Sequence, residues 1–163
     1  MTANSVKKKV VLIDLDIVTV SLWDKIGKNK EKADHFLNRV KNLEFTAVTP
    51  MLLIDVVERW RHQSLKSRIK EFYKTYSSRI YTDIEIKEKC RQGNIDYESV
   101  LDALEQNGVK REDAALVLVA SLFSCDALVT FNRVHLRNKK EAVNQVLVRW
   151  SLLPIQIAGP EEL

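Results

Sequence analysis

Short apolar runs alternate along the chain with longer segments in which apolar residues recur at helical spacing. The apolar runs predict strands at residues 9–14, 45–48, 79–81, 127–129 and 153–157. The longer segments predict helices at residues 17–26, 32–41, 50–76, 83–91, 96–106, 111–123 and 141–150. Strands that alternate with helices are typical of βαβ units. The pattern therefore predicts an α/β fold with a mostly parallel sheet covered on both faces. The length of 163 residues predicts one domain over residues 1–163.

The apolar stretch at residues 10–13 runs directly into Asp14 and Asp16. A short continuous apolar run is typical of a strand buried on both faces. Ligands bind at the carboxyl ends of such strands in open α/β sheets, and a buried carboxylate needs a partner of opposite charge. The two aspartates therefore indicate a cation site at the end of this strand. The alternative is that they only end the strand or cap the next helix.

Further acids follow the other predicted strands. Asp55 lies in the helix after the second strand, Asp113 lies in the first turn of the most apolar helix, and Asp126, Thr130 and Asn132 flank the fourth strand. Clustered carboxylates repel one another unless a cation is present, and hard oxygen ligands suit Mg²⁺ or Mn²⁺. Each acid also has a simpler interpretation. Asp113 could only favour the helix dipole, and Asp55 could lie on a surface beside a basic residue one turn later.

The charge distribution favours a polyanionic partner. The net charge is +4 and the pI is about 9.0, and residues 133–140 carry four basic side chains and no acid. The reverse holds for residues 83–105, whose acids we interpret as a solvated helical face or a surface for a partner.

Several features predict a cytoplasmic protein that does not associate with membranes. Cys90 and Cys125 are too few for a disulfide framework, and the context of Cys125 indicates a buried thiol. The first apolar run is too short for a signal peptide, and no segment approaches the roughly 20 apolar residues that span a bilayer.

Three of these stretches give the chain a resemblance to the PIN-domain nucleases. Residues 11–16 match the family's aspartate at the end of strand one, and residues 49–55 match its Thr-Pro helix start with an acid six residues on. The family more often has Glu at the position of Asp55. The most specific match is at residues 112–135, where an aspartate opens an Ala-rich helix and a strand ends in Thr-Phe-Asn. The resemblance covers most of the chain and is weakest at residues 81–109.

This resemblance implies a three-layer α/β/α fold with a central, mostly parallel sheet of four or five strands. It also implies an endoribonuclease that depends on Mg²⁺ or Mn²⁺. The VapC-like toxins are the largest such group, which implies RNA as substrate, an antitoxin partner and a homodimer. The implied catalytic residues are Asp14, Asp55, Asp113, Thr130 and Asn132.

The resemblance also assigns roles around that set. Asp14 and Asp113 are the implied principal metal ligands, with Asp55 completing the acidic pocket. The family's last acid falls at the neutral Asn132, which either weakens metal binding or moves that role to Asp126 or Asp16. Asp16 is otherwise expected next to the ligands rather than among them. The residues implied to hold the RNA backbone are Arg133, Arg137, Lys139 and Lys140, although this basic run could also be a solvated helix start.

Two other functions compete with this one. A degenerate PIN domain could bind RNA or a protein without cleavage, and Asn132 favours that alternative. A HAD-type phosphatase would explain the Asp-x-Asp motif at residues 14–18, but it also needs an acidic pair soon after Thr130. The acids that follow Thr130 are Glu141, Glu161 and Glu162, so the order of motifs does not fit.

Overall fold

The computed structural model describes residues 6–163. Its centre is a five-stranded sheet in the order β3-β2-β1-β4-β5, and every neighbouring pair of strands is parallel. The strands are β1 (Lys9–Ile13), β2 (Phe45–Pro50), β3 (Ser77–Tyr81), β4 (Ala127–Val129) and β5 (Gln156–Ala158). This confirms the predicted parallel sheet, with β1 at its middle.

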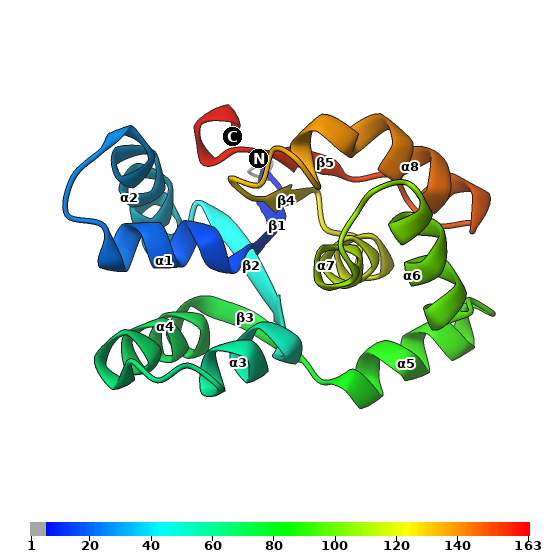
Figure 1. Ribbon diagram of the computed structural model, residues 1–163, viewed down its shortest axis with the longest axis horizontal. Coiled ribbons are helices and arrows are strands. Elements are labelled where there is room, and N and C mark those ends of the chain that lie inside the picture. Colours follow the sequence, from blue (N-terminus) through cyan, green and yellow to red (C-terminus); the bar gives the residue numbers. More distant parts are fainter. Residues whose placement is uncertain (1–5) are drawn as a thin grey trace, which may run out of the picture.

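Helices cover both faces of the sheet, which confirms the three-layer α/β/α arrangement (Figure 1). One layer contains α1 (Leu15–Trp23), α2 (Lys28–Lys41), α3 (Met51–Glu58) and α4 (Gln63–Tyr76). The other contains α5 (Asp83–Gln92), α6 (Tyr97–Gln106), α7 (Arg111–Leu122) and α8 (Lys140–Arg149). Two short 3₁₀ turns complete the chain, η1 (Arg137–Lys139) and η2 (Pro160–Glu162). Among the described residues, no helix is long and apolar enough to cross a membrane.

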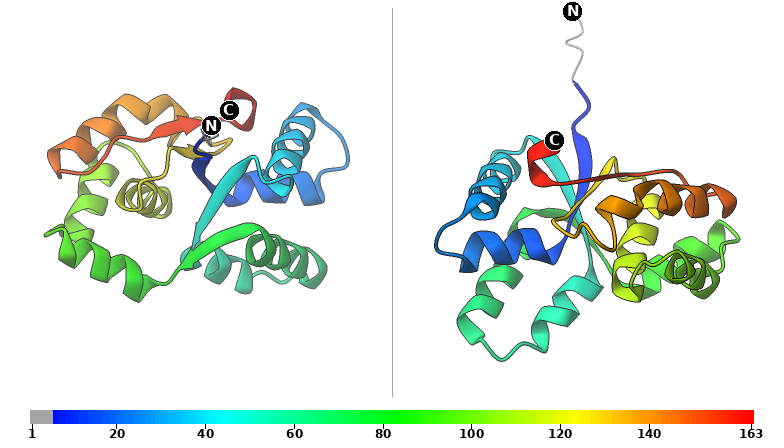
Figure 2. Two further views of the ribbon diagram at one scale, coloured as in Figure 1. Left: turned by 180° about the vertical axis from the view of Figure 1, so that it is seen from behind. Right: turned by 45° about the horizontal axis from the view of Figure 1, so that its top comes forward.

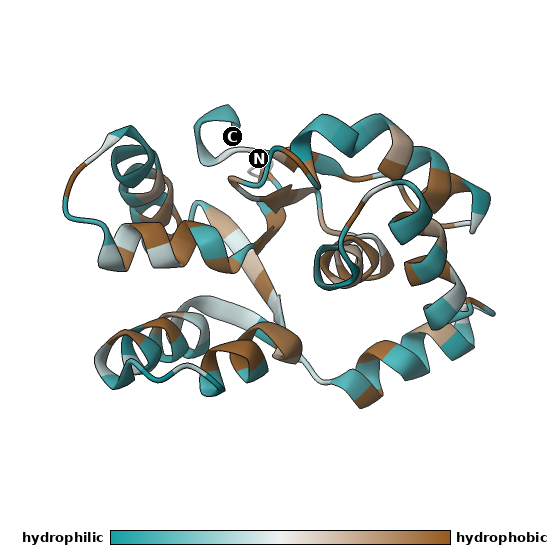
Figure 3. Cartoon of the chain, in the orientation of Figure 1, coloured by the Kyte–Doolittle hydropathy of each residue, from teal (hydrophilic) through white to brown (hydrophobic). Residues whose placement is uncertain are grey.

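The core follows the apolar pattern of the sequence. Hydrophobic colour gathers on the central strands and on α7, while the outer helices are hydrophilic on their solvent side (Figure 3). All residues of α7 from Ala114 to Leu122 are buried, as expected of a helix that is apolar all round. β1 and β4 are paired from Val11 with Ala127 to Ile13 with Val129, so their buried side chains lie at the same level. The Cys125 thiol is buried, as predicted.

The prediction of one helix over residues 50–76 was wrong. The chain leaves the helical path at Arg59, and α4 starts only after His62. The ring Nδ1 of His62 accepts a hydrogen bond of 3.1 Å from the backbone N–H of Leu65, so this histidine caps α4. Apolar spacing continues through both helices, which is why the pattern alone hides the break.

Thr49 does not cap α3 as predicted. It lies in β2, which extends to Pro50, and its hydroxyl is 2.7 Å from the hydroxyl of Ser77 on the neighbouring strand. α1 also differs from the prediction, because it begins at Leu15 rather than Ile17 and ends at Trp23. This earlier start places Asp14 at the N-cap of α1, with an extended backbone (φ −64°, ψ 151°).

Because the strands are parallel, their carboxyl ends lie at one edge of the sheet. Asp14 follows β1 at this edge, and Thr130 follows β4. Pairing continues past the strands, because the N–H of Asp14 donates to Val129 O (2.9 Å) and that of Thr130 donates to Ala158 O (2.9 Å). The two views in Figure 2 show the helices leaving the sheet on either side of this edge. The fold therefore places the ends of β1 and β4 side by side.

Candidate functional site

Asp14 is the innermost acid of the site, and its residue is only 7% exposed. Its Oδ1 accepts a hydrogen bond of 2.7 Å from the N–H of Leu15, the first residue of α1. Its Oδ2 accepts one of 2.8 Å from the hydroxyl of Thr130, which is fully buried. Both oxygens are thus oriented by the chain, and Asp14 is held at the end of β1.

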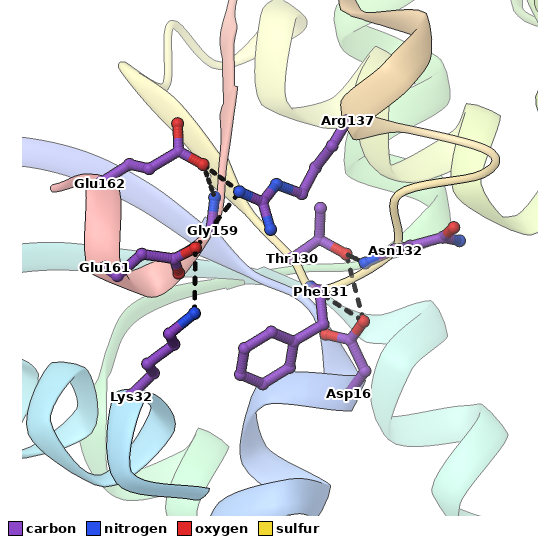
Figure 4. A network of polar contacts seen from close by, with 9 residues as sticks. All are labelled: Asp16, Lys32, Thr130, Phe131, Asn132, Arg137, Gly159, Glu161 and Glu162. Carbon is purple, nitrogen blue, oxygen red and sulfur yellow. Dashed lines mark hydrogen bonds and ion pairs between the residues drawn. The ribbon is translucent and has the colours of Figure 1, made fainter. Parts of the chain in front are cut away.

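Asp16 lies in the first turn of α1, two residues after Asp14, and contacts the same threonine. Its Oδ2 lies 3.2 Å from the Thr130 hydroxyl and accepts a hydrogen bond of 3.1 Å from the N–H of Phe131. Figure 4 shows these contacts converging from α1 and the segment after β4. Its Oδ1 is buried and has no hydrogen-bond partner among the described residues. Asp16 therefore belongs to the acidic site directly.

Asp113 approaches from the first turn of α7. Its Oδ2 accepts a hydrogen bond of 3.0 Å from the side-chain Nδ2 of Asn132. The Oδ1 of Asn132 accepts one of 3.1 Å from the N–H of His135, and the N–H of Asn132 donates to the Thr130 hydroxyl (3.0 Å). Asn132 thus connects Asp113 with the loop after β4, and the structure brings Asp14, Asp113, Thr130 and Asn132 into one connected network.

Burial raises the pKa of all three acids. The pKa of Asp14 rises from 3.8 to about 7, first through loss of solvent and then through the neighbouring charge of Asp16. The pKa of Asp16 rises to about 6, again mainly through burial. Burial also raises the pKa of Asp113, although His135 and Lys110 oppose the rise. The site thus gathers three carboxyl groups whose protonated form burial favours.

Two residues predicted for the site lie elsewhere, and Asp126 is the clearer case. It precedes β4 at the amino edge of the sheet, where its Oδ2 accepts a hydrogen bond of 2.7 Å from the N–H of Val10. The length of β4, at about 3.3 Å per residue, separates it from Thr130. Asp126 therefore does not join the other acids, and the choice between Asn132 and Asp126 as fourth group falls away.

Asp55 is exposed on α3, in a neighbouring groove of about 530 Å³ between α3, α6 and α7. Arg59, Arg111 and Glu112 line this groove as well. Glu112 precedes Asp113, so the groove adjoins the acidic network. Asp55 borders the site rather than completing its pocket.

The basic segment divides into two groups. Arg133 and Lys140 are exposed, whereas Arg137 and Lys139 are partly buried. The Arg137 side chain is 14% exposed and forms ion pairs with Glu161 (3.3 Å) and Glu162 in η2. Glu161 also pairs with Lys32 at 3.6 Å (Figure 4). Arg137 therefore holds the last turn of the chain, a contact between distant residues that the local charge pattern does not reveal.

Sequence reasoning also missed a residue beneath the acids. Tyr73 of α4 is fully buried, and its hydroxyl donates a hydrogen bond of 3.0 Å to the carbonyl of Ile13. This contact joins α4 to the last residue of β1, directly before Asp14. Because 60 residues separate the two partners, no local pattern could have identified it.

The donor set fits a hard divalent cation. Mg²⁺ prefers carboxylate oxygens, commonly takes only one or two carboxylates and keeps several waters. The orphaned Oδ1 of Asp16 and the raised pKa values of Asp14 and Asp16 are the features that such an ion would relieve. Over residues 6–163, however, no three His, Cys, Asp or Glu side chains are grouped so that they could hold a metal ion by themselves. Water or substrate oxygens would have to complete the coordination.

Comparison with known proteins gives support at the level of the fold. No protein-family model and no curated protein sequence matches the chain. Among solved structures, the chain is similar to VapBC2 from Rickettsia felis, which was crystallised bound to a DNA fragment from their promoter. The TM-score is 0.56 at 12% identity, and the match covers 92% of this chain and 98% of that chain. The likeness supports the PIN-like fold that the sequence motifs implied.

The raised pKa values predict how stability depends on pH in metal-free protein. Protonation of an acid stabilises the folded state when the pKa of that acid is higher in the folded protein than in the unfolded chain. The contribution of Asp14 and Asp16 is therefore fully present below about pH 4 and is lost as the pH rises to about 7. We expect Asp14→Asn to unfold several degrees higher than wild type at pH 8, at about 2–4 °C per kcal/mol, and to lose this advantage at pH 4.

Thermal unfolding in EDTA, recorded for both proteins from pH 4 to pH 8, measures this difference. Using the difference cancels the titration of groups that do not interact with Asp14. A constant gap between wild type and Asp14→Asn across the range would contradict the assigned burial effect.

The position of Arg137 predicts a structural role. Arg137→Gln removes a partly buried partner of Glu161 and Glu162, so we expect it to lower the free energy of unfolding by about 1–3 kcal/mol. The exposed Lys140→Gln should change it by no more than about 0.5 kcal/mol. Urea unfolding monitored by circular dichroism compares the two. Equal stability of both variants would show that the ion pairs of η2 contribute little.

Proposed function

We propose that this protein is a Mg²⁺- or Mn²⁺-dependent endoribonuclease whose site lies at the carboxyl edge of the sheet. The observation that carries the proposal is the network of Asp14, Asp16, Asp113, Thr130 and Asn132, in which hydrogen bonds to Thr130 and Asn132 connect the three acids. Buried acids with raised pKa values lower the stability of the folded protein, and such residues are found more often at functional sites than in structural roles. The PIN-like fold adds support, because the same positions form the motifs of that family.

Each residue has a definite task in this proposal. Thr130 orients the Asp14 carboxylate through its hydroxyl, and the N–H of Leu15 fixes the other Asp14 oxygen. Asn132 holds one oxygen of Asp113, which leaves the second oxygen available for a water or a substrate group. A bound Mg²⁺ or Mn²⁺ ion would supply neutralisation of phosphate charge and a water of lowered pKa.

The RNA backbone requires positive charge next to these acids. Arg133 and Lys140 are exposed on the segment that follows Asn132, so we propose that they hold phosphates in a salt-dependent and sequence-independent way. Arg137 and Lys139 are less available. The ion pairs of Arg137 restrict its guanidinium, and Lys139 lies partly buried near Gly108.

The setting that we propose is a toxin–antitoxin pair. The similar structure is a VapBC2 complex bound to promoter DNA, and its likeness covers nearly the whole of both chains. We therefore propose that this nuclease is cytoplasmic and that it binds an antitoxin-like protein partner there. Formation of a homodimer stays a prediction of the resemblance.

A domain that binds RNA without cleaving it is the second candidate. Asn132 donates a hydrogen bond to Asp113 where the family has an acid, so one Asp113 oxygen is already occupied. This contact favours the alternative. No comparable contact supports the phosphatase alternative. The acidic pair that it would need, Glu161 and Glu162, forms ion pairs with Arg137 instead.

Cleavage of labelled RNA in Mn²⁺ tests the proposal. We expect Asp14→Asn and Asp113→Asn each to lower the cleavage rate by on the order of 100-fold, because each removes a charge from the site. Asp24→Asn is the matched control, since this exposed aspartate lies at the far end of α1. Equal rates in all four proteins would disprove the proposal. RNA binding by wild type without any cleavage would favour the second candidate.

A further inference from the structure

We infer that Asp16, together with Asp14, holds the divalent cation of this site, and that Asn132 acts as a clamp on Asp113 rather than as a ligand. This inference rests on the proposed nuclease function and specifies its metal site. It moves the ion from the pair implied by the family resemblance, Asp14 and Asp113, to two carboxylates at the start of α1, the N-cap Asp14 and the first-turn Asp16.

The first argument is the unpaired oxygen of Asp16. Its Oδ2 has two donors, the Thr130 hydroxyl at 3.2 Å and the N–H of Phe131 at 3.1 Å. Its Oδ1 is buried and receives no hydrogen bond from the described residues. Leaving a buried charged oxygen without a partner is costly, so such an atom commonly marks a missing water or ion. The orientation of Asp16 is thus fixed through one oxygen, while the other has no hydrogen-bond donor among the described residues.

The second argument is the shared hydroxyl of Thr130. It lies 2.8 Å from Asp14 Oδ2 and 3.2 Å from Asp16 Oδ2, and it also accepts a hydrogen bond from the N–H of Asn132. A hydroxyl has a single proton, so it can serve only one of the two carboxylates at a time. When both carboxylates are ionised, one of them lacks this donor, and a bound cation would supply the missing positive charge.

The third argument is that both ends of the Asn132 side chain are in use. Its Oδ1, the atom that could bind a metal, accepts the N–H of His135, and its Nδ2 donates to Asp113 Oδ2. The amide therefore ties Asp113 to the loop after β4. Its nitrogen also supplies Asp113 Oδ2 with a donor.

Two carboxylates are enough for such a site. Mg²⁺ is usually held by one or two protein carboxylates, with waters and substrate phosphate in the other positions. The pair of Asp14 and Asp16 meets this requirement without Asp126, which lies at the opposite edge of the sheet. Asp113 would then be left to contact a water or the substrate.

Mn²⁺ titration by calorimetry, without RNA, tests the assignment. We expect Asp16→Asn to weaken Mn²⁺ binding by roughly tenfold or more. Asn132→Ala removes the clamp on Asp113 but no ligand, so it should weaken Mn²⁺ binding less than Asp16→Asn does. Asp24→Asn is again the matched control on α1 and should bind like wild type.

A second measurement guards against misfolding. The rise in melting temperature on adding Mn²⁺ should be lost in Asp16→Asn and also in Asp16→Ser, while both variants stay folded in EDTA. Loss of Mn²⁺ binding in Asp113→Asn together with wild-type binding in Asp16→Asn would overturn the inference and leave the nuclease proposal standing. Absence of Mn²⁺ binding in the wild type itself would overturn both.

Discussion

The buried hydrogen bond from the Thr130 hydroxyl to the Asp14 carboxylate joins the ends of β1 and β4, and the rest of the site is arranged around it. It forms because the parallel register of these strands ends both at the same level, Ile13 opposite Val129. From that point, α1 leaves with Asp14 as its cap, and the loop after Thr130 turns back toward Asp113. The geometry of the acids is therefore a consequence of strand register and not of local sequence alone.

Burial dominates the electrostatics of this arrangement. Asp14 caps the N-terminus of α1, where the helix dipole favours a negative charge by about 0.3–1 kcal/mol. Its pKa nevertheless rises from 3.8 to about 7, and each pKa unit corresponds to about 1.4 kcal/mol. Loss of solvent and the nearby Asp16 thus outweigh the dipole and the hydrogen bonds. A simple capping role would not explain why two carboxylates share this place.

The sequence predicted the sheet, its helical layers and the central group Asp14, Asp113, Thr130 and Asn132, because strand ends and an apolar helix determine these positions. The sequence did not predict features that depend on contacts between residues far apart in the chain. The partners of Arg137 lie in η2, Tyr73 reaches Ile13 across the core, and Asp126 lies at the amino edge of the sheet. The break between α3 and α4 was hidden for a different reason, since the apolar spacing continues through it.

The neutral residue at position 132 is the feature that separates this site from the family pattern, and the structure shows what it does. An aspartate at this position would face Asp113 as a second negative charge, whereas the Asn132 amide gives Asp113 a donor. The site thereby has one carboxylate fewer beside α7, while Asp16 contributes one beside α1, with a buried oxygen that accepts no hydrogen bond from the described residues. Compared with the PIN-domain pattern, the number of acids around Thr130 is the same, but the acids lie closer to the end of β1. In the proposed assignment, the site keeps the charge that a divalent ion requires although one motif position is neutral.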